Sequence, residues 1–397
     1  MLKTPDDRTT LLRLANVCLA DREGLFDVVL GAGVIGSIEP ASTVNEATEA
    51  LDLEGRLLLP AFVDGHIHLD KTFLGLPWRP HVEGHTVAAR IAAERKERAT
   101  AAREMPMKVR ACKLIDRIAG YGTLALRSHI DIDEEIGLSH VHDLLALREE
   151  VAGLVDIQFV AFPQSGLTAK VREMMDEALS LGVDLVGGLD PAGIDNDLEG
   201  HLDTVFELAE KHGRGVDIHL HDPGLLGTFE LKQIARRSAA LGMQGHVAVS
   251  HAYALGMVDA GELAATASEL QRGGVSIMTN GPGNAAIPPI KALIEAGVRV
   301  FSGCDNIRDA WSPFGTGDLL ERAAVIGYRA GFASDADLAL AFDLVTTHSR
   351  AVMGLAPVTL EPGSPADLVA VKAENLSEAV ASTPRERMVF RKGRPLA

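Results

Sequence analysis

The stretch FVDGHIHLD at residues 62–70 decides the fold of this 397-residue chain, because it is the first of a series of short apolar runs that end in polar side chains. Most of these runs are followed by an amphipathic helical stretch, as at 168–181, 201–213, 229–242 and 316–331. The seven later runs are TLALRSHIDID (123–133), VDIQFVAFP (155–163), GVDLVGGLDP (182–191), RGVDIHLHD (214–222), GHVAVSHAYA (245–254), GVSIMTN (274–280) and VRVFSGCDN (298–306). Eight strand and helix units in succession predict an α/β fold, a closed (β/α)8 TIM barrel of parallel strands.

Short strand-like runs also flank the barrel series at both ends of the chain. GRLLLP (55–60) precedes it, and the pattern of short strands broken by Pro and Gly returns in LEPGSPADLVAV (360–371). Pairing of the two ends predicts a small discontinuous β-sandwich domain. The expected division is an N-terminal part of this domain at 1–57, a metal-dependent barrel at 58–358 and a C-terminal part at 359–397.

The connection between His68 and Gly120 is longer than an ordinary loop. It contains the charged helical run AARIAAERKERATAAREM at residues 88–105. Two interpretations fit this run: a cover over the barrel mouth, or a helix with a solvated charged face.

Composition narrows the class of protein and its partners. Hydrophobic residues make up 47% of the chain and aromatics only 4%, which is typical of an α/β protein with many turns. The formal net charge of −17 argues against nucleic acid or an anionic membrane as a partner. The first residues carry Asp and Arg where a secretory signal is apolar, so we expect a cytoplasmic protein. Whether it forms a homo-oligomer stays open.

Polar residues that close the apolar runs are the candidates for chemistry, because barrel active sites lie at the C-terminal ends of the strands. His66 and His68 end the first run, and alternation along a strand directs both imidazoles to the same side. His219 ends the fifth run and Asp305 the eighth. The three Cys are well separated, so a metal must use His and carboxylates. Three imidazoles and one carboxylate suit one divalent ion, Zn or Fe, with a position left for water.

A family resemblance runs through the same motifs. The barrel with its split β-domain and the segment VDGHIHLDK (63–71) resemble the amidohydrolase superfamily. Within it, DIQFVAFPQSG (156–166), VSHA (249–252) and DNIRDAWSPFG (305–315) are similar to the cytosine deaminase branch. The resemblance implies hydrolysis of a carbon–nitrogen bond in a small heterocyclic substrate.

The resemblance also implies a mononuclear metal centre. His66, His68, His219 and Asp305 match the ligand positions of the family. The fourth-strand segment VGGLDPA (186–192) lacks the Lys that other members carboxylate to bridge two metals. We therefore expect one metal ion.

Four residues are expected to act in the catalytic step. Asp305 is placed to accept the proton of the attacking water, and His251 to steady the developing negative charge. His221 and Asp222 are the candidates that protonate the departing amine, a role that contributes on the order of 10²–10⁴-fold. His221 alternatively only orients a neighbouring ligand.

Five residues are expected to contact the substrate. By the resemblance, Gln164 bonds the amide edge of the ring, while Trp311 either stacks on the ring or packs in the core. Asp70 and Lys71 either position the substrate or form a structural ion pair. Asn306 stands where the deaminase has Asp, just as Asp222 stands where it has Glu, and both departures weaken cytosine as the substrate.

Three further polar residues at strand ends are given structural roles. We expect His129 and Asp131 of the second run to support the fold, and Asp190 to shape the floor of the pocket.

The function that these expectations favour is hydrolytic removal of ammonia or an alkylamine from an aminotriazine or pyrimidine-like ring. Deamination of cytosine or a modified cytosine and hydrolysis of a cyclic amide are alternatives that use the same metal chemistry. A metal-free binding module is a remote alternative, because all four expected ligands are present.

Overall fold

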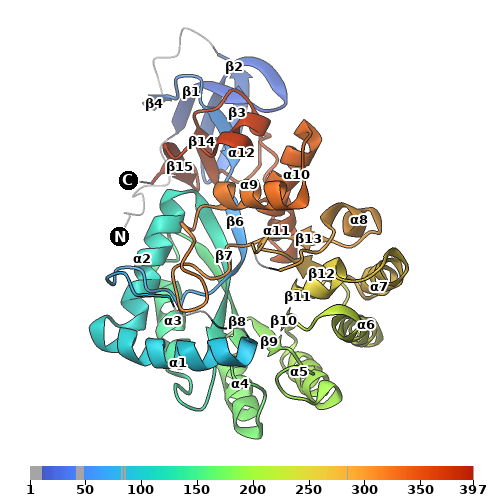
Figure 1. Ribbon diagram of the computed structural model, residues 1–397. Coiled ribbons are helices and arrows are strands. Elements are labelled where there is room, and N and C mark those ends of the chain that lie inside the picture. The colour runs from blue at the N-terminus through green and yellow to red at the C-terminus, as the bar shows by residue number, and fades with distance from the viewer. Residues whose placement is uncertain (1–10, 42–48, 82–83, 85, 284, 397) are drawn as a thin grey trace.

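The computed structural model describes residues 11–41, 49–81, 84, 86–283 and 285–396 (Figure 1). A parallel eight-stranded sheet follows the order of the chain from its first strand to its last. A bridge between Ile67 and Asp305 joins the first strand to the segment after the last one. The predicted barrel is therefore confirmed. Its strands are β6 (Phe62–Ile67), β7 (Thr123–Asp131), β8 (Asp156–Phe162), β9 (Leu185–Leu189), β10 (Gly215–Leu220), β11 (Val247–His251), β12 (Val275–Met278) and β13 (Val300–Phe301).

Helices surround the barrel strands (Figure 1). They are α2 (Met107–Gly120), α3 (Ser139–Glu150), α4 (Ala169–Leu181), α5 (Leu198–His212), α6 (Gly224–Ala240), α7 (Ala260–Gly273), α8 (Ile290–Glu295), α9 (Leu319–Ala330), α10 (Asp335–Leu344) and α11 (Thr347–Val352). The capping residues explain where the helices differ from the predicted limits. Asp197 and Asp318 accept hydrogen bonds from the first turns of α5 and α9, and Pro223 directly precedes α6. Among the described residues, no helix is both long enough and apolar enough to span a bilayer.

A second sheet combines strands from both ends of the chain, as predicted. Its order is β16-β15-β14-β5-β1-β2-β3, with β4 paired to β1, so the described strands form one hydrogen-bonded sheet. In Figure 1 the blue N-terminal strands lie beside the red C-terminal ones. The elements are β1 (Leu12–Leu19), β2 (Arg22–Gly31), β3 (Val34–Pro40), β4 (Glu49–Asp52), β5 (Leu57–Pro60), β14 (Leu368–Val371), α12 (Leu376–Ser382), β15 (Arg387–Arg391) and β16 (Arg394–Pro395). The domain limits after residues 57 and 358 stay predictions.

A buried ion pair ties this sheet to the barrel helices. Arg387 in β15 donates to both carboxylate oxygens of Asp318, at 2.8 and 2.6 Å, and to the carbonyl of Tyr121 at 2.9 Å. The Arg387 side chain is fully buried. We expect Arg387→Ala to lower the free energy of unfolding by ~3–5 kcal/mol, because it leaves the Asp318 charge buried without its partner. Urea unfolding measures this difference, with Arg385→Ala as an exposed control; equal midpoints for the two variants would contradict it.

Helix α1 (Val87–Glu104) corresponds to the charged run between the first two barrel strands. Its buried residues are Ile91, Glu94, Arg98 and Ala101, which share one face of the helix. Arg98 Nη2 lies 2.7 Å from Asp133 Oδ2, just beyond β7. One face of α1 therefore covers the barrel at the C-terminal ends of its strands, while the rest of the helix meets solvent.

Candidate functional site

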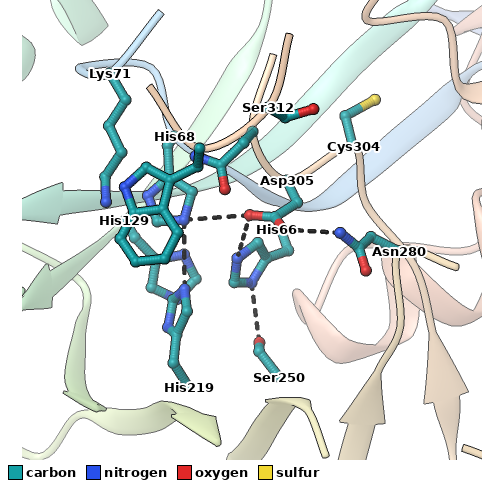
Figure 2. A network of polar contacts seen from close by, with 12 residues as sticks. His66, His68, Lys71, His129, His219, Ser250, Asn280, Cys304, Asp305 and Ser312 are labelled. Atoms are coloured by element: carbon teal, nitrogen blue, oxygen red, sulfur yellow. Dashed lines mark hydrogen bonds and ion pairs between the residues drawn. The ribbon is translucent and has the colours of Figure 1, made fainter. Parts of the chain in front are cut away.

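The four expected metal ligands converge at the C-terminal end of the barrel (Figure 2). Asp305 Oδ1 lies 3.5 Å from His66 Nε2 and 3.4 Å from His68 Nε2. His219 Nε2 lies 3.3 Å from His68 Nε2. All four side chains are buried.

Two local features bring Asp305 against His66. Gly303 has no side chain, and a Cβ at this position would lie 2.4 Å from the backbone of His66, so only glycine allows this approach. Asp305 itself has a left-handed backbone, with φ of 61°. Asp tolerates this conformation better than most residues do, and such positions cluster at functional sites.

The charge states of these groups suit a cation. Burial lowers the pKa of His68 to about 3, and burial together with His129 and His66 lowers that of His219 well below its ordinary value. Burial opposes the ionised form of Asp305, but the neighbouring imidazoles of His66 and His68 hold its pKa well below the usual range. The neutral imidazoles of His68 and His219 offer lone pairs, and the Asp305 carboxylate offers one negative charge.

The hydrogen bonding of the cluster tests whether a metal fits. His66 Nε2 is buried and has no hydrogen-bond partner among the described residues. His66 Nε2 and His68 Nε2 both face Oδ1 of Asp305. Buried lone pairs without donors are costly unless a cation accepts them. The cluster therefore fits one divalent metal ion.

His129 is a fifth member of this cluster that the sequence interpretation placed in a structural role. Its ring centroid lies 4.2 Å from that of His66 and 4.5 Å from that of His219. Neither of its ring nitrogens has a hydrogen bond within the described part of the chain. Burial lowers its pKa to about 4. The signal that points to it is the same as for His219, a His near the end of a barrel strand.

A buried chain of hydrogen bonds sets the tautomer of His66. Ser250 Oγ lies 2.9 Å from Asp217 Oδ1 and 2.9 Å from His66 Nδ1. Arg127 Nη1 holds the other oxygen of Asp217 at 2.9 Å. A carboxylate only accepts, so the Ser250 hydroxyl donates to Asp217 and its oxygen accepts from His66 Nδ1. This leaves the lone pair of His66 on Nε2, which faces Asp305.

We expect Ser250→Ala to weaken Zn²⁺ binding by about 10–100-fold, because the partner of a ligating His fixes its orientation and tautomer. Competition with a chromophoric chelator measures the affinity without any turnover. Ser250→Thr keeps the hydroxyl and should recover most of the affinity. If Ser250→Ala binds Zn²⁺ as tightly as the unmodified chain, the hydrogen-bond chain does not orient the ligand.

His221 and His251 line the cavity above the cluster, together with Tyr253. The imidazole rings of His221 and His251 stack with their centroids 4.5 Å apart. His221 Nδ1 lies 2.9 Å from Asp190 Oδ2. Burial disfavours the charged form of His221, but Asp190 outweighs this and raises its pKa. Burial and the charge on His221 lower the pKa of His251 well below its ordinary value.

Asp222 points elsewhere. The cavity lining does not include it, and its Oδ2 accepts a hydrogen bond from the Gly193 amide at 2.8 Å. His221 therefore reaches the cavity and Asp222 supports the loop after β9.

The cavity has a volume of about 1400 Å³ and is lined by several of the expected substrate contacts. Lys71, Gln164, Asn306 and Trp311 line it. Lys71 Nζ donates to Gln164 Oε1 at 2.8 Å and lies 5.4 Å from the centre of the Trp311 ring. Asn306 Nδ2 donates to Asp309 Oδ2 at 2.7 Å.

Asp70 is not part of the cavity lining. Its Oδ2 accepts from the Asp131 amide at 2.9 Å and lies 3.1 Å from His140 Nδ1. These contacts of Asp70 join the end of β7 to the start of α3.

Comparison with known proteins agrees with this geometry. The model of a protein family described as the amidohydrolase family matches residues 49–397. N-isopropylammelide isopropyl amidohydrolase of Pseudomonas sp. (strain ADP) is 31% identical over 393 residues, 96% of each chain. The crystal structure of N-isopropylammelide isopropylaminohydrolase from Burkholderia multivorans superimposes with a TM-score of 0.92 at 37% identity over 98% of each chain. That of 5-methylcytosine deaminase from Klebsiella pneumoniae with phosphonocytosine gives a TM-score of 0.84 at 28% identity, also over 98% of each chain.

Proposed function

This chain belongs to the amidohydrolase family, and we propose that it hydrolyses a carbon–nitrogen bond of a small nitrogen heterocycle and releases ammonia or an alkylamine. The observation that carries the proposal is the convergence of His66, His68, His219 and Asp305 beneath a cavity that also holds His221 and His251. The two isopropylammelide enzymes, similar along nearly the whole chain, favour an aminotriazine or a pyrimidine-like ring.

We assign His66, His68, His219 and Asp305 as the residues that hold one Zn or Fe ion. Imidazole and carboxylate suit both metals. When bound, such an ion would lower the pKa of a water molecule towards ~7 and so supply a nucleophile near neutral pH.

The side chains around the cluster divide the proton transfers. Asp305 accepts the proton of the attacking water, and Asn280 Nδ2, 2.7 Å from Asp305 Oδ2, keeps this carboxylate turned into the site. His251 steadies the negative charge that develops on the ring. His221, whose charged form Asp190 favours, protonates the departing nitrogen.

A second group of cavity residues binds the ring. Gln164 pairs with its amide edge, Trp311 stacks on its face, and Lys71 and Asn306 contact its polar substituents. In this assignment Asp70 positions Asp131 at the end of β7, and Asp222 positions the loop that follows Asp190.

Deamination of cytosine or a modified cytosine is the second candidate. The similarity to 5-methylcytosine deaminase, at 28% identity over 98% of each chain, favours it. Asp222 and Asn306, which replace the Glu and Asp expected for that activity, argue against it.

The decisive experiment is a screen of the purified Zn²⁺- or Fe²⁺-loaded protein against cytosine, 5-methylcytosine, aminotriazines, N-alkylaminotriazines and cyclic ureas. We expect release of ammonia or an alkylamine from a ring of the triazine or pyrimidine type. Alkylamine release from N-isopropylammelide selects the first candidate, and ammonia release from the cytosines selects the second. Ring opening of a cyclic urea without amine release would overturn both.

A cytoplasmic location stays a prediction, and the sequence predicts no particular oligomeric state. Cell fractionation and light scattering test them.

A further inference from the structure

Helix α1 places one carboxylate among three of the side chains proposed to bind the ring. Glu94 is only 3% exposed. Its Oε2 accepts from Gln164 Nε2 at 2.6 Å and from the indole Nε1 of Trp311. The same oxygen lies 3.5 Å from Lys71 Nζ. Glu94 does not itself line the cavity.

The partners of Gln164 fix which way its amide points. The Lys71 ammonium has only donors, so the atom of Gln164 that faces it at 2.8 Å must be the oxygen. The Glu94 carboxylate has only acceptors, so the atom that faces it must be the nitrogen. The flipped amide would set its N–H groups against an ammonium and its oxygen against a carboxylate. One N–H and one oxygen lone pair of Gln164 then remain for a ligand, and these complement the amide edge of a ring.

The charges around this carboxylate support its contact with Lys71. Although burial opposes the charged form, Asp131 and Glu94 raise the pKa of Lys71 above its ordinary value. Asp131 Oδ1 lies 3.2 Å from Lys71 Nζ, and its Oδ2 lies 3.5 Å from Arg98 Nη1. Lys71 therefore contacts both Asp131 and Glu94, and Arg98 contacts Asp131 from the same helix as Glu94.

Apolar contacts hold α1 in the same place. Ile91, one turn before Glu94, forms an apolar cluster with Phe162 at the end of β8 and Leu189 at the end of β9, and Trp311 packs against this cluster. At the other end of the buried face, Arg98 is anchored to Asp133. The helix therefore approaches Trp311 with a packing residue and a hydrogen-bond acceptor on one face.

We infer that Glu94 is a positioning residue for substrate recognition, which orients the Gln164 amide and the Trp311 indole from outside the cavity. The inference rests on the proposed function, because Gln164 and Trp311 are ring contacts only under it. Through Glu94, helix α1 would contribute to substrate specificity, although it supplies no group to the reaction itself.

The test is Glu94→Gln, which keeps the size of the side chain but removes the acceptor-only carboxylate. With N-isopropylammelide as substrate, KM is expected to rise about 10-fold, the effect of one hydrogen bond to a charged partner, while kcat and bound Zn²⁺ change little. A purely structural role would instead lower the folded fraction or the metal content. Glu97→Gln, on the same helix, is the control, because Glu97 pairs with Arg79 and is farther from the site.

A second readout needs no turnover. The chain has two tryptophans, Trp311 and Trp78, and Trp78 is 63% exposed. In a Trp78→Phe variant, all of the tryptophan emission therefore comes from Trp311. In that background Glu94→Gln should shift the emission maximum of Trp311, and Glu97→Gln should not. If the protein turns over no heterocycle, the proposed function fails, yet the emission still decides the contact of Glu94 with Trp311.

Two results would overturn the inference. One is a folded Glu94→Gln protein with unchanged KM and unchanged Trp311 emission. If Glu94→Gln does not fold, Glu94→Asp keeps the charge but shortens the side chain by one methylene. The other overturning result is a folded Glu94→Asp protein whose KM and Trp311 emission both match those of the unmodified chain.

Discussion

Asp305→Asn is expected to lower kcat/KM by at least ~10³-fold while the protein stays folded. The change removes the one carboxylate of the cluster and the proton acceptor for the attacking water, and loss of a single acid–base group alone costs on the order of 10²–10⁴-fold. Asn keeps the shape of the side chain and tolerates the left-handed backbone at this position, where φ is 61°. Steady-state kinetics and circular dichroism measure the two effects.

Metal analysis separates this result from a general loss of structure. Asp305→Asn should hold less Zn²⁺ at equilibrium, and Asp305→Ala should lose activity as fully, with an added cost in stability from its backbone conformation. Asp335→Asn, on the exposed start of α10, should match the unmodified chain in both assays. Undiminished turnover in a folded Asp305→Asn protein would remove the proposed mechanism.

The convergence of the four candidate ligands was predictable because the rule behind it is local. His66, His68, His219 and Asp305 each end or follow a barrel strand, and the C-terminal ends of parallel strands meet at one rim whatever the loops do. The same rule applies to His129, at the end of β7. Sequence alone does not show that this ring lies 4.2 Å from that of His66, because strand curvature and register set that distance.

The contacts of Glu94 with Gln164 and Trp311 were not predictable, because they join segments that are far apart in the sequence. Glu94 meets Gln164 across 70 positions and Trp311 across 217. In the sequence it is one charge in a charged helical run, and nothing in that run distinguishes a buried carboxylate from a solvated one. The different positions of His221 and Asp222 were not predictable either. Adjacent side chains point to different sides of the chain, and only the fold shows that the His221 side faces the cavity.

The second large effect is expected at His221, which faces the cavity from the end of β10. His221→Gln should lower kcat by about 10²–10⁴-fold on an amine-releasing substrate, because an amine leaves slowly unless a positioned acid protonates it. The loss should be much smaller on a chloro-substituted triazine, since chloride departs without a proton. A role only in orienting His219 would instead lower the rates on both substrates together and reduce the bound metal.

Two neighbouring variants distinguish the acid from its supports. Asp190→Asn should give a smaller loss than His221→Gln, because it leaves the imidazole in place and removes only the carboxylate 2.9 Å from Nδ1 that favours its charged form. Asp222→Asn should disturb the loop at Gly193 and affect kcat least of the three. If Asp222→Asn instead shows the largest loss, confined to substrates with an amine leaving group, Asp222 is the proton donor and His221 its support.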